Sequence, residues 1–176
     1  MSDKMTESPI YDRQVDDSSR VNIVCAYADL NGKLGSTSCP ISTSDIKKFG
    51  ADYYALGGRH DASKFLSAGA SKYSYCGSLE CTGFEENGLG GVNLITIDYC
   101  DGEITIENKS VPFGHIKFET ESLDITGVSS NNEIINRISQ LISKKKYDNE
   151  TALRIELTGY VSPDFVVPKN IENDAF

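Results

Sequence analysis

The sequence predicts a mixed α/β (α+β) fold, in which a layer with parallel strands is followed by a small β-α-β subdomain. Two apolar runs, "VNIVCAY" at residues 21–27 and "DYYAL" at 52–56, flank a short helical stretch, which is the order of a crossover between parallel strands. Asp101-Gly102 separates two alternating runs and is a strong hairpin signal. Apolar residues recur at helical spacing over 134–142, between two further strand-like runs.

The first part of the chain provides a strand, a loop, a helix and a second strand. Residues 21–27 have the length and β-branched content of a buried strand. Glycines and a proline mark the loop over 28–40. Residues 41–50 are typical of a short helix, which Ser42 or Ser44 would cap and which a glycine ends. The strand "DYYAL" then follows.

Short strands are predicted over the next stretch of the chain. The candidates are "KFLSAGA" (64–70), "KYSYC" (72–76), "GVNLITIDY" (91–99) and "EITIENKSV" (103–111). The stretch "GFEENGLGG" is rich in glycine but matches no phosphate-binding fingerprint, because no lysine follows it and no strand-to-helix transition frames it. We interpret it as a loop.

A β-α-β unit is predicted over residues 111–160. "HIKFETESLDITG" and "TALRIELTGY" are strand-like, and "SNNEIINRISQLISKKK" is an amphipathic helix that Ser130 or Asn131 can cap. These boundaries suggest four segments along the chain: a flexible lead-in at 1–19, a main layer at 20–110, the β-α-β unit at 111–162 and a tail at 163–176.

Composition predicts a soluble globular protein, and the simplest compartment is the cytoplasm. The 176 residues are 39% hydrophobic and 24% charged, and no run of about 18 apolar residues suggests a membrane span. The first twenty residues lack the apolar core of a signal peptide. The net charge of −9 argues against an autonomous nucleic-acid binder. The basic run 144–146 closes a helix, where cations suit the helix dipole.

The five cysteines favour buried free thiols over a metal site or a disulfide framework. Their number is odd, and no pair has the CxxC spacing of a zinc knuckle. Cys25 and Cys76 fall in or beside predicted strands, so we expect both in the core.

Several motifs occur together in an order and spacing typical of one known family. They are "NIVCAYADLNG", "DYYALGGRH", "YCGSLECTGFEENGLGGV" and the β-α-β unit that ends in "LTGY", and they cover residues 20–162. In this order they resemble the C-terminal half of a calcineurin-like metallophosphoesterase, most closely the bacterial DNA-repair exonucleases of the SbcD and YhaO type. The resemblance implies a partial phosphoesterase sheet over 20–110, a cap over 111–162 and, in a complete enzyme, Mn²⁺-dependent phosphodiester hydrolysis.

The chain departs from this family at most metal-ligand positions. The resemblance places three histidines at positions 27, 58 and 60, where this sequence has Tyr27, Gly58 and His60. The "DxH", "GD" and "GNHD" motifs of the family's N-terminal half have no counterpart in residues 1–20. A two-metal site needs several ligands for each cation, so one imidazole cannot hold it.

We therefore interpret His60 as the remnant of a metal site. Asp29 and Asp61 lie near the lost positions and are auxiliary ligand candidates. Tyr27 could fill the space of a histidine as an aromatic plug. We expect no catalytic residue and no cofactor in the isolated chain; Mn²⁺ belongs to the resembled family.

Two functions from different classes follow. In the first, the chain is the C-terminal portion of a repair-type exonuclease, inactive alone, whose partner is an N-terminal phosphoesterase half; DNA is then a ligand of the complete enzyme only. In the second, the chain is a non-enzymatic module that kept the fold and binds another protein, as its acidic balance suggests. A homodimer through an exposed sheet face is a further option, and no membrane partner is expected.

Overall fold

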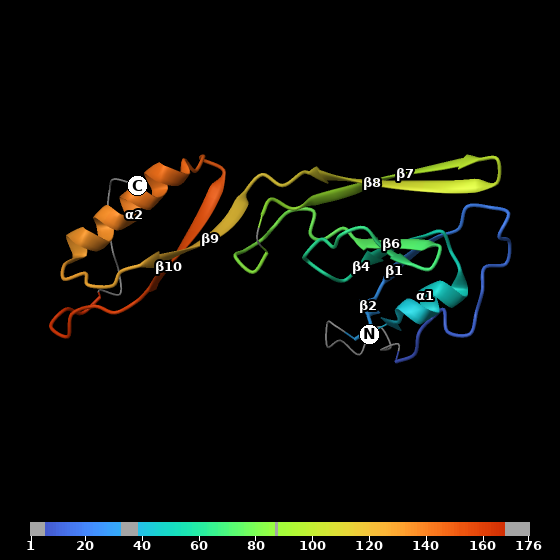
Figure 1. Ribbon diagram of the computed structural model, residues 1–176, viewed down its shortest axis with the longest axis horizontal. Helices are drawn as coiled ribbons and strands as arrows, with labels where there is room; N and C mark the ends of the chain where they lie inside the picture. The colour runs from blue at the N-terminus through green and yellow to red at the C-terminus, as the bar shows by residue number, and fades with distance from the viewer. Residues whose placement is uncertain (1–5, 33–38, 87, 168–176) are drawn as a thin grey trace. The chain divides into compact units, whose positions relative to one another are not determined.

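The computed structural model describes residues 6–32, 39–86 and 88–167 and has a mixed α/β fold (Figure 1). Two helices and ten strands occur within these ranges, and the strands form several small sheets, not a barrel. The predicted α/β class is therefore confirmed. Parts of the predicted lead-in, of the loop over 28–40 and of the tail lie outside the described residues.

The chain divides into two compact units. The first comprises Met1–Cys81 and Leu89–Gly114, and the second comprises Thr82–Gly88 and His115–Phe176. Each unit has its own buried cluster of apolar side chains.

The first unit contains a four-stranded sheet in the order β1-β4-β6-β5. Its strands are β1 (Ile23–Tyr27), β4 (Tyr53–Gly57), β5 (Leu66–Ala68) and β6 (Ser71–Tyr75). β1, β4 and β6 run parallel, and β5 is antiparallel to β6. The prediction that residues 21–27 and 52–57 share a parallel sheet is confirmed.

The crossover between β1 and β4 contains helix α1 (Thr43–Phe49), as predicted. Ser42 is its N-cap: the Ser42 hydroxyl accepts from the Asp45 N–H, and the Asp45 carboxylate accepts from the Ser42 N–H. Gly50 ends the helix in a left-handed conformation. Before the helix, β2 (Asp29–Leu30) and β3 (Pro40–Ile41) form a short parallel pair.

The sheet of the first unit partly buries one face of β1 and exposes the other. Tyr54 and Leu56 of β4 belong to the same buried cluster as Ile46 of α1, and each is at most 2% exposed. In contrast, Ile23 and Tyr27 on β1 are 54% and 64% exposed. The expectation of a buried strand over 21–27 is therefore wrong for half of its side chains, because alternate residues of a strand point to opposite faces.

The same alternation corrects the expectation for two cysteines. Cys25 is exposed, whereas its neighbours Val24 and Ala26 pack against the core. Cys76 follows the last residue of β6 and is also exposed. Both were expected in the core, and Cys81 is the buried one; all five cysteines are free thiols.

A long hairpin follows in the first unit, formed by β7 (Gly91–Cys100) and β8 (Glu103–Pro112). Asp101 and Gly102 both have positive φ angles, 52° and 85°, as a two-residue hairpin turn with the twist of its strands requires. The predicted hairpin is confirmed. Asn93 of β7 donates from Nδ2 to the Ser74 hydroxyl on β6, at 3.3 Å.

The second unit is a β-α-β unit, as predicted. β9 (Lys117–Asp124) and β10 (Thr151–Thr158) are parallel, and helix α2 (Asn131–Lys145) connects them with Ser130 as its N-cap. Its core is formed by Ile125, Val128 and Ile134, against which Leu123, Ile138, Leu157, Val161, Phe165 and Val167 pack. No helix in the described part of the chain is long and apolar enough to cross a membrane.

Candidate functional site

The carboxyl ends of β1, β4 and β6 lie along one edge of the first unit's sheet, because these strands are parallel neighbours. The loops that leave this edge contain residues 28–31, 58–63 and 76–78. In α/β sheets, ligands bind preferentially outside the carboxyl ends of the strands. We call this edge the carboxyl edge, and it carries every site residue that the sequence predicted.

Tyr27 and Gly58 touch one another at the carboxyl edge. Gly58 has a φ angle of +101°, which side chains disfavour, and a Cβ atom there would lie 3.0 Å from Cζ of Tyr27. The Tyr27 ring therefore lies against the Gly58 backbone. Tyr27 is 64% exposed, so it contacts Gly58 at the surface and not in a buried pocket.

His60 belongs to a loop whose backbone is tightly packed. The His60 carbonyl accepts from the Ser78 N–H at 2.8 Å. A Cβ atom at Gly77 would lie 2.7 Å from both the His60 oxygen and the Ala62 nitrogen. Only a glycine permits this close approach, so Gly77 sets the position of the loop that presents His60.

The candidate metal ligands differ in their exposure. His60 and Asp61 are exposed, whereas Asp29 on β2 is only 1% exposed. Among the described residues no group of three or more His, Cys, Asp or Glu side chains is placed to hold a metal ion. The residues present therefore do not fit a two-metal centre, which needs several ligands for each cation.

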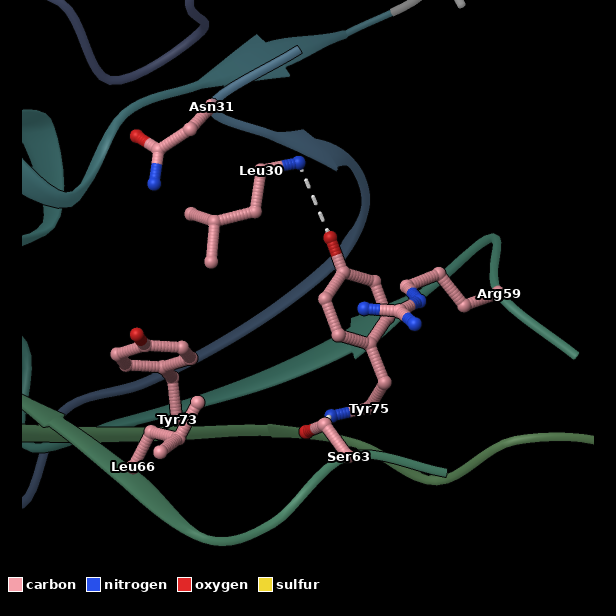
Figure 2. Close-up of a pocket in the computed structure, with 7 residues that line it drawn as sticks. All are labelled: Leu30, Asn31, Arg59, Ser63, Leu66, Tyr73 and Tyr75. Atoms are coloured by element: carbon pink, nitrogen blue, oxygen red, sulfur yellow. Dashed lines mark hydrogen bonds between the residues drawn. The ribbon is translucent and has the colours of Figure 1, made fainter. Parts of the chain in front are cut away.

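Two residues that sequence reasoning did not select, Arg59 and Tyr75, are central to the carboxyl edge (Figure 2). The Tyr75 hydroxyl donates to the Ala28 carbonyl at 2.7 Å and accepts from the Leu30 N–H at 3.1 Å. Burial raises the pKa of Tyr75, so this hydroxyl stays protonated. It therefore fixes the loop after β1 to the end of β6.

The Arg59 guanidinium lies over the Tyr75 ring, with Cζ 5.3 Å from the ring centroid, which is the distance of a cation–π contact. Beside this pair is a hollow of about 70 Å³, lined by Leu30, Asn31, Arg59, Ser63, Leu66, Tyr73 and Tyr75. The position of Arg59 directly after Gly57-Gly58, at the end of a strand, was the signal in the sequence that could have singled it out.

No protein-family model and no curated protein matches the chain. The resemblance to the C-terminal half of a calcineurin-like metallophosphoesterase thus stays a prediction from motifs.

Proposed function

We propose that the chain is the C-terminal portion of a metallophosphoesterase similar to DNA-repair exonucleases, with too few metal ligands to act alone. One observation carries the proposal: the residues at the three expected ligand positions occur at one sheet edge. Tyr27 ends β1, its ring contacts Gly58 beyond the end of β4, and His60 lies two residues further along the same loop. Histidines introduced at 27 and 58 would therefore occupy two positions whose present residues are in contact.

The chemistry of such a site explains why this chain would be inactive. A two-metal phosphoesterase uses bridged cations to activate water and to stabilise the leaving oxygen. Of the three expected histidines, this chain supplies only His60. The remaining ligands, and with them Mn²⁺ binding, would have to come from a separate N-terminal half.

The other motifs of the resemblance have consistent structural roles, which support the proposal. In "YCGSLE", Tyr75 and Gly77 hold the loops of the carboxyl edge together. In "LTGYV", Leu157 and Val161 pack in the core of the second unit. Gly159 between them approaches the Asp124–Thr126 turn so closely that a Cβ atom would lie 2.3 Å from Asp124 Oδ1.

One observation is compatible with the alternative, a non-enzymatic module that binds another protein. β1 is the terminal strand of its sheet among the described residues, and its outward face exposes Ile23, Cys25 and Tyr27. Such apolar side chains on an edge strand are typical of a surface that a partner covers. The same surface would serve a separate N-terminal half, so it does not decide between the two functions.

A nuclease assay with Mn²⁺ on single- and double-stranded DNA tests the proposal. The purified chain is expected to cleave neither substrate, whereas metal-dependent cleavage that His60→Ala abolishes would overturn the account of an incomplete site. The neighbouring coding sequence separates the two functions. A segment with "DxH", "GD" and "GNHD" motifs directly upstream supports the exonuclease portion, and its absence supports the binding module.

A further inference from the structure

The Arg59 guanidinium has no carboxylate partner among the described residues. It is half-buried and stacks on the Tyr75 ring. Cations in such positions are usually paired, because removing a charge from water is costly. An unpaired guanidinium beside a hollow is therefore an open binding group.

A second arginine in the chain provides a direct contrast. In the second unit, Cζ of Arg154 lies 5.2 Å from the centroid of the Phe84 ring, nearly the distance of the Arg59 pair. Arg154 also donates from Nε to the Thr120 hydroxyl at 3.2 Å and pairs with Glu156 at 3.4 Å. A guanidinium in this protein can thus stack on a ring and also pair with a carboxylate, as Arg154 does. Arg59 differs because it has no such carboxylate partner among the described residues.

The hollow beside Arg59 has apolar walls and room for a small molecule. Its volume is about 70 Å³, several times the roughly 10–15 Å³ that a single water requires, so it has room for more than one water or for a short organic acid. Leu30, Leu66 and Tyr73 line it, and Asn31 lies across Leu30 from Arg59 (Figure 2). Because Asn31 and Leu66 are exposed, the hollow reaches solvent.

The lining favours one class of anion. The planar guanidinium fork matches a carboxylate or a phosphate. A phosphate carries more charge and more acceptor oxygens than one guanidinium can satisfy. Leu30 and Leu66 offer no donors, so further donors could come only from the polar groups of Asn31, Ser63 and Tyr73 in the lining. A carboxylate with a short apolar body matches both the cation and the walls.

We propose that this hollow binds a small monocarboxylate, with the carboxylate on Arg59 and a short aliphatic chain against Leu30, Leu66 and Tyr73. Arg59 lies between positions 58 and 60 of the carboxyl edge, but this proposal does not depend on the proposed metal chemistry. Tyr75 is a positioning residue: its hydroxyl is held by Ala28 and Leu30, so its ring presents a fixed face to the guanidinium.

The test is an NMR titration of the isotope-labelled full chain with butyrate, with its neutral isostere butyramide, and with inorganic phosphate. Butyrate is expected to cause saturable shifts of the Leu30 and Tyr75 amide signals, with an apparent Kd at least tenfold lower than that of butyramide. Arg59→Met should weaken butyrate binding at least tenfold. The matched control Arg154→Met, which removes the other stacked guanidinium, should leave it unchanged.

Three results would overturn the proposal. They are equal binding of butyrate and butyramide, absence of saturable shifts at Leu30 and Tyr75, and tighter binding of phosphate than of butyrate. The comparison of the two isosteres uses the unmodified chain, so it decides the question even where Arg59→Met does not fold.

Discussion

Each unit contains an arginine stacked on an aromatic ring, but the two arginines differ in their other partners. In the second unit, the arginine stacked on an aromatic ring is bonded to a hydroxyl and a carboxylate, so its charge is satisfied within the unit. At the carboxyl edge of the first unit, Arg59 makes the same kind of stack without an acid among the described residues. The comparison teaches that a cation–π stack occurs with and without an acidic partner, so the stack alone does not mark a functional residue.

Each unit also contains a glycine at which an added Cβ atom would meet a neighbouring segment, but the kind of atom it would meet differs. The atoms that a Cβ at Gly77 would meet are backbone atoms of the loop that presents His60. The nearest atoms that a Cβ at Gly159 would meet, at 2.3 Å, are the side-chain oxygens of Asp124 and Thr126. Side chains can rotate away and backbone cannot, so the carboxyl edge is the more rigidly determined of the two places.

The largest expected effect is therefore that of Gly77→Ala. It adds positive-φ strain of about 1–2 kcal/mol and overpacking of about 1–3 kcal/mol, so we expect a loss of about 4 kcal/mol in the free energy of unfolding. Gly159→Ala should lose about 2 kcal/mol, because side chains give way. Gly32→Ala, at a φ of +67° with no atom within 4 Å, is the control, and its loss should be about 1 kcal/mol.

Urea denaturation followed by NMR signals from each unit measures these losses separately. A Gly77→Ala variant as stable as Gly32→Ala would show that the loop of His60 is not held by backbone packing.

The contact between Tyr27 and Gly58 gives the next largest effect. Gly58→Ala should cost about 2 kcal/mol, from positive-φ strain and from contact with the ring. In a Tyr27→Ala background the ring is absent, and the same change should cost only about 1 kcal/mol. A double-mutant cycle by denaturation measures the difference. Equal costs in the two backgrounds would mean that the ring does not lie against Gly58.

The stability of the second unit is expected to fall at alkaline pH. Burial, together with the Glu121 carboxylate that accepts its hydrogen bond, raises the pKa of Tyr147 to about 12. The unfolded chain ionises this phenol near its ordinary pKa of about 10, so the folded unit holds the proton more tightly. The stabilisation is complete below about pH 10 and is lost as pH rises toward 12.

Ultraviolet titration of tyrosinate in the chain and in Tyr147→Phe measures this effect. The substitution should remove one late-titrating phenol and flatten the loss of stability between pH 10 and 12. If all tyrosines that titrate late persist in Tyr147→Phe, the assignment to this residue is wrong.

The smallest effect concerns the two arginines themselves. Arg154→Met should destabilise by about 1 kcal/mol, because it removes a cation–π contact and partly exposed polar contacts. Arg59→Met should change stability by less than about 0.5 kcal/mol, since the unpaired charge gains little from folding. Thermal denaturation compares them. A larger loss for Arg59→Met than for Arg154→Met would reveal a structural role for Arg59 instead of an open binding group.

The elements of the fold could be predicted where the signal is local. The helix over Asn131–Lys145 followed from apolar spacing and a capping serine, and the hairpin followed from Asp101-Gly102. The exposure of Ile23, Cys25 and Tyr27 could not be predicted in this way. Whether the second face of a strand is covered depends on segments far away in the sequence, and periodicity does not report them.

The candidate site was predictable in part for the same reason. The motifs singled out Tyr27, Gly58 and His60, and the parallel strand order brings the first two into contact. The cation–π contact of Arg59 with Tyr75 joins residues sixteen positions apart through the packing of neighbouring strands, and neither local sequence predicts it.

The central claim is that positions 27, 58 and 60 of the carboxyl edge mark an incomplete metal site. Calorimetric titration of Zn²⁺ into the chain, and into the double variant Tyr27→His with Gly58→His, tests it most directly. Imidazole suits Zn²⁺, and three imidazoles can hold one ion where a single one competes poorly with water. Replacing the Tyr27 ring also frees the space that a side chain at position 58 needs, although the φ of +101° still opposes it.

We expect no specific Zn²⁺ binding by the unmodified chain. We expect one bound ion in the double variant, lost again when His60→Ala is added, with circular dichroism confirming that each variant is folded. A folded double variant that fails to bind would contradict the claim that the three positions converge. Stoichiometric binding by the unmodified chain that His60→Ala abolishes would contradict the claim that the site is incomplete, and would assign ligand roles to Asp29 or Asp61.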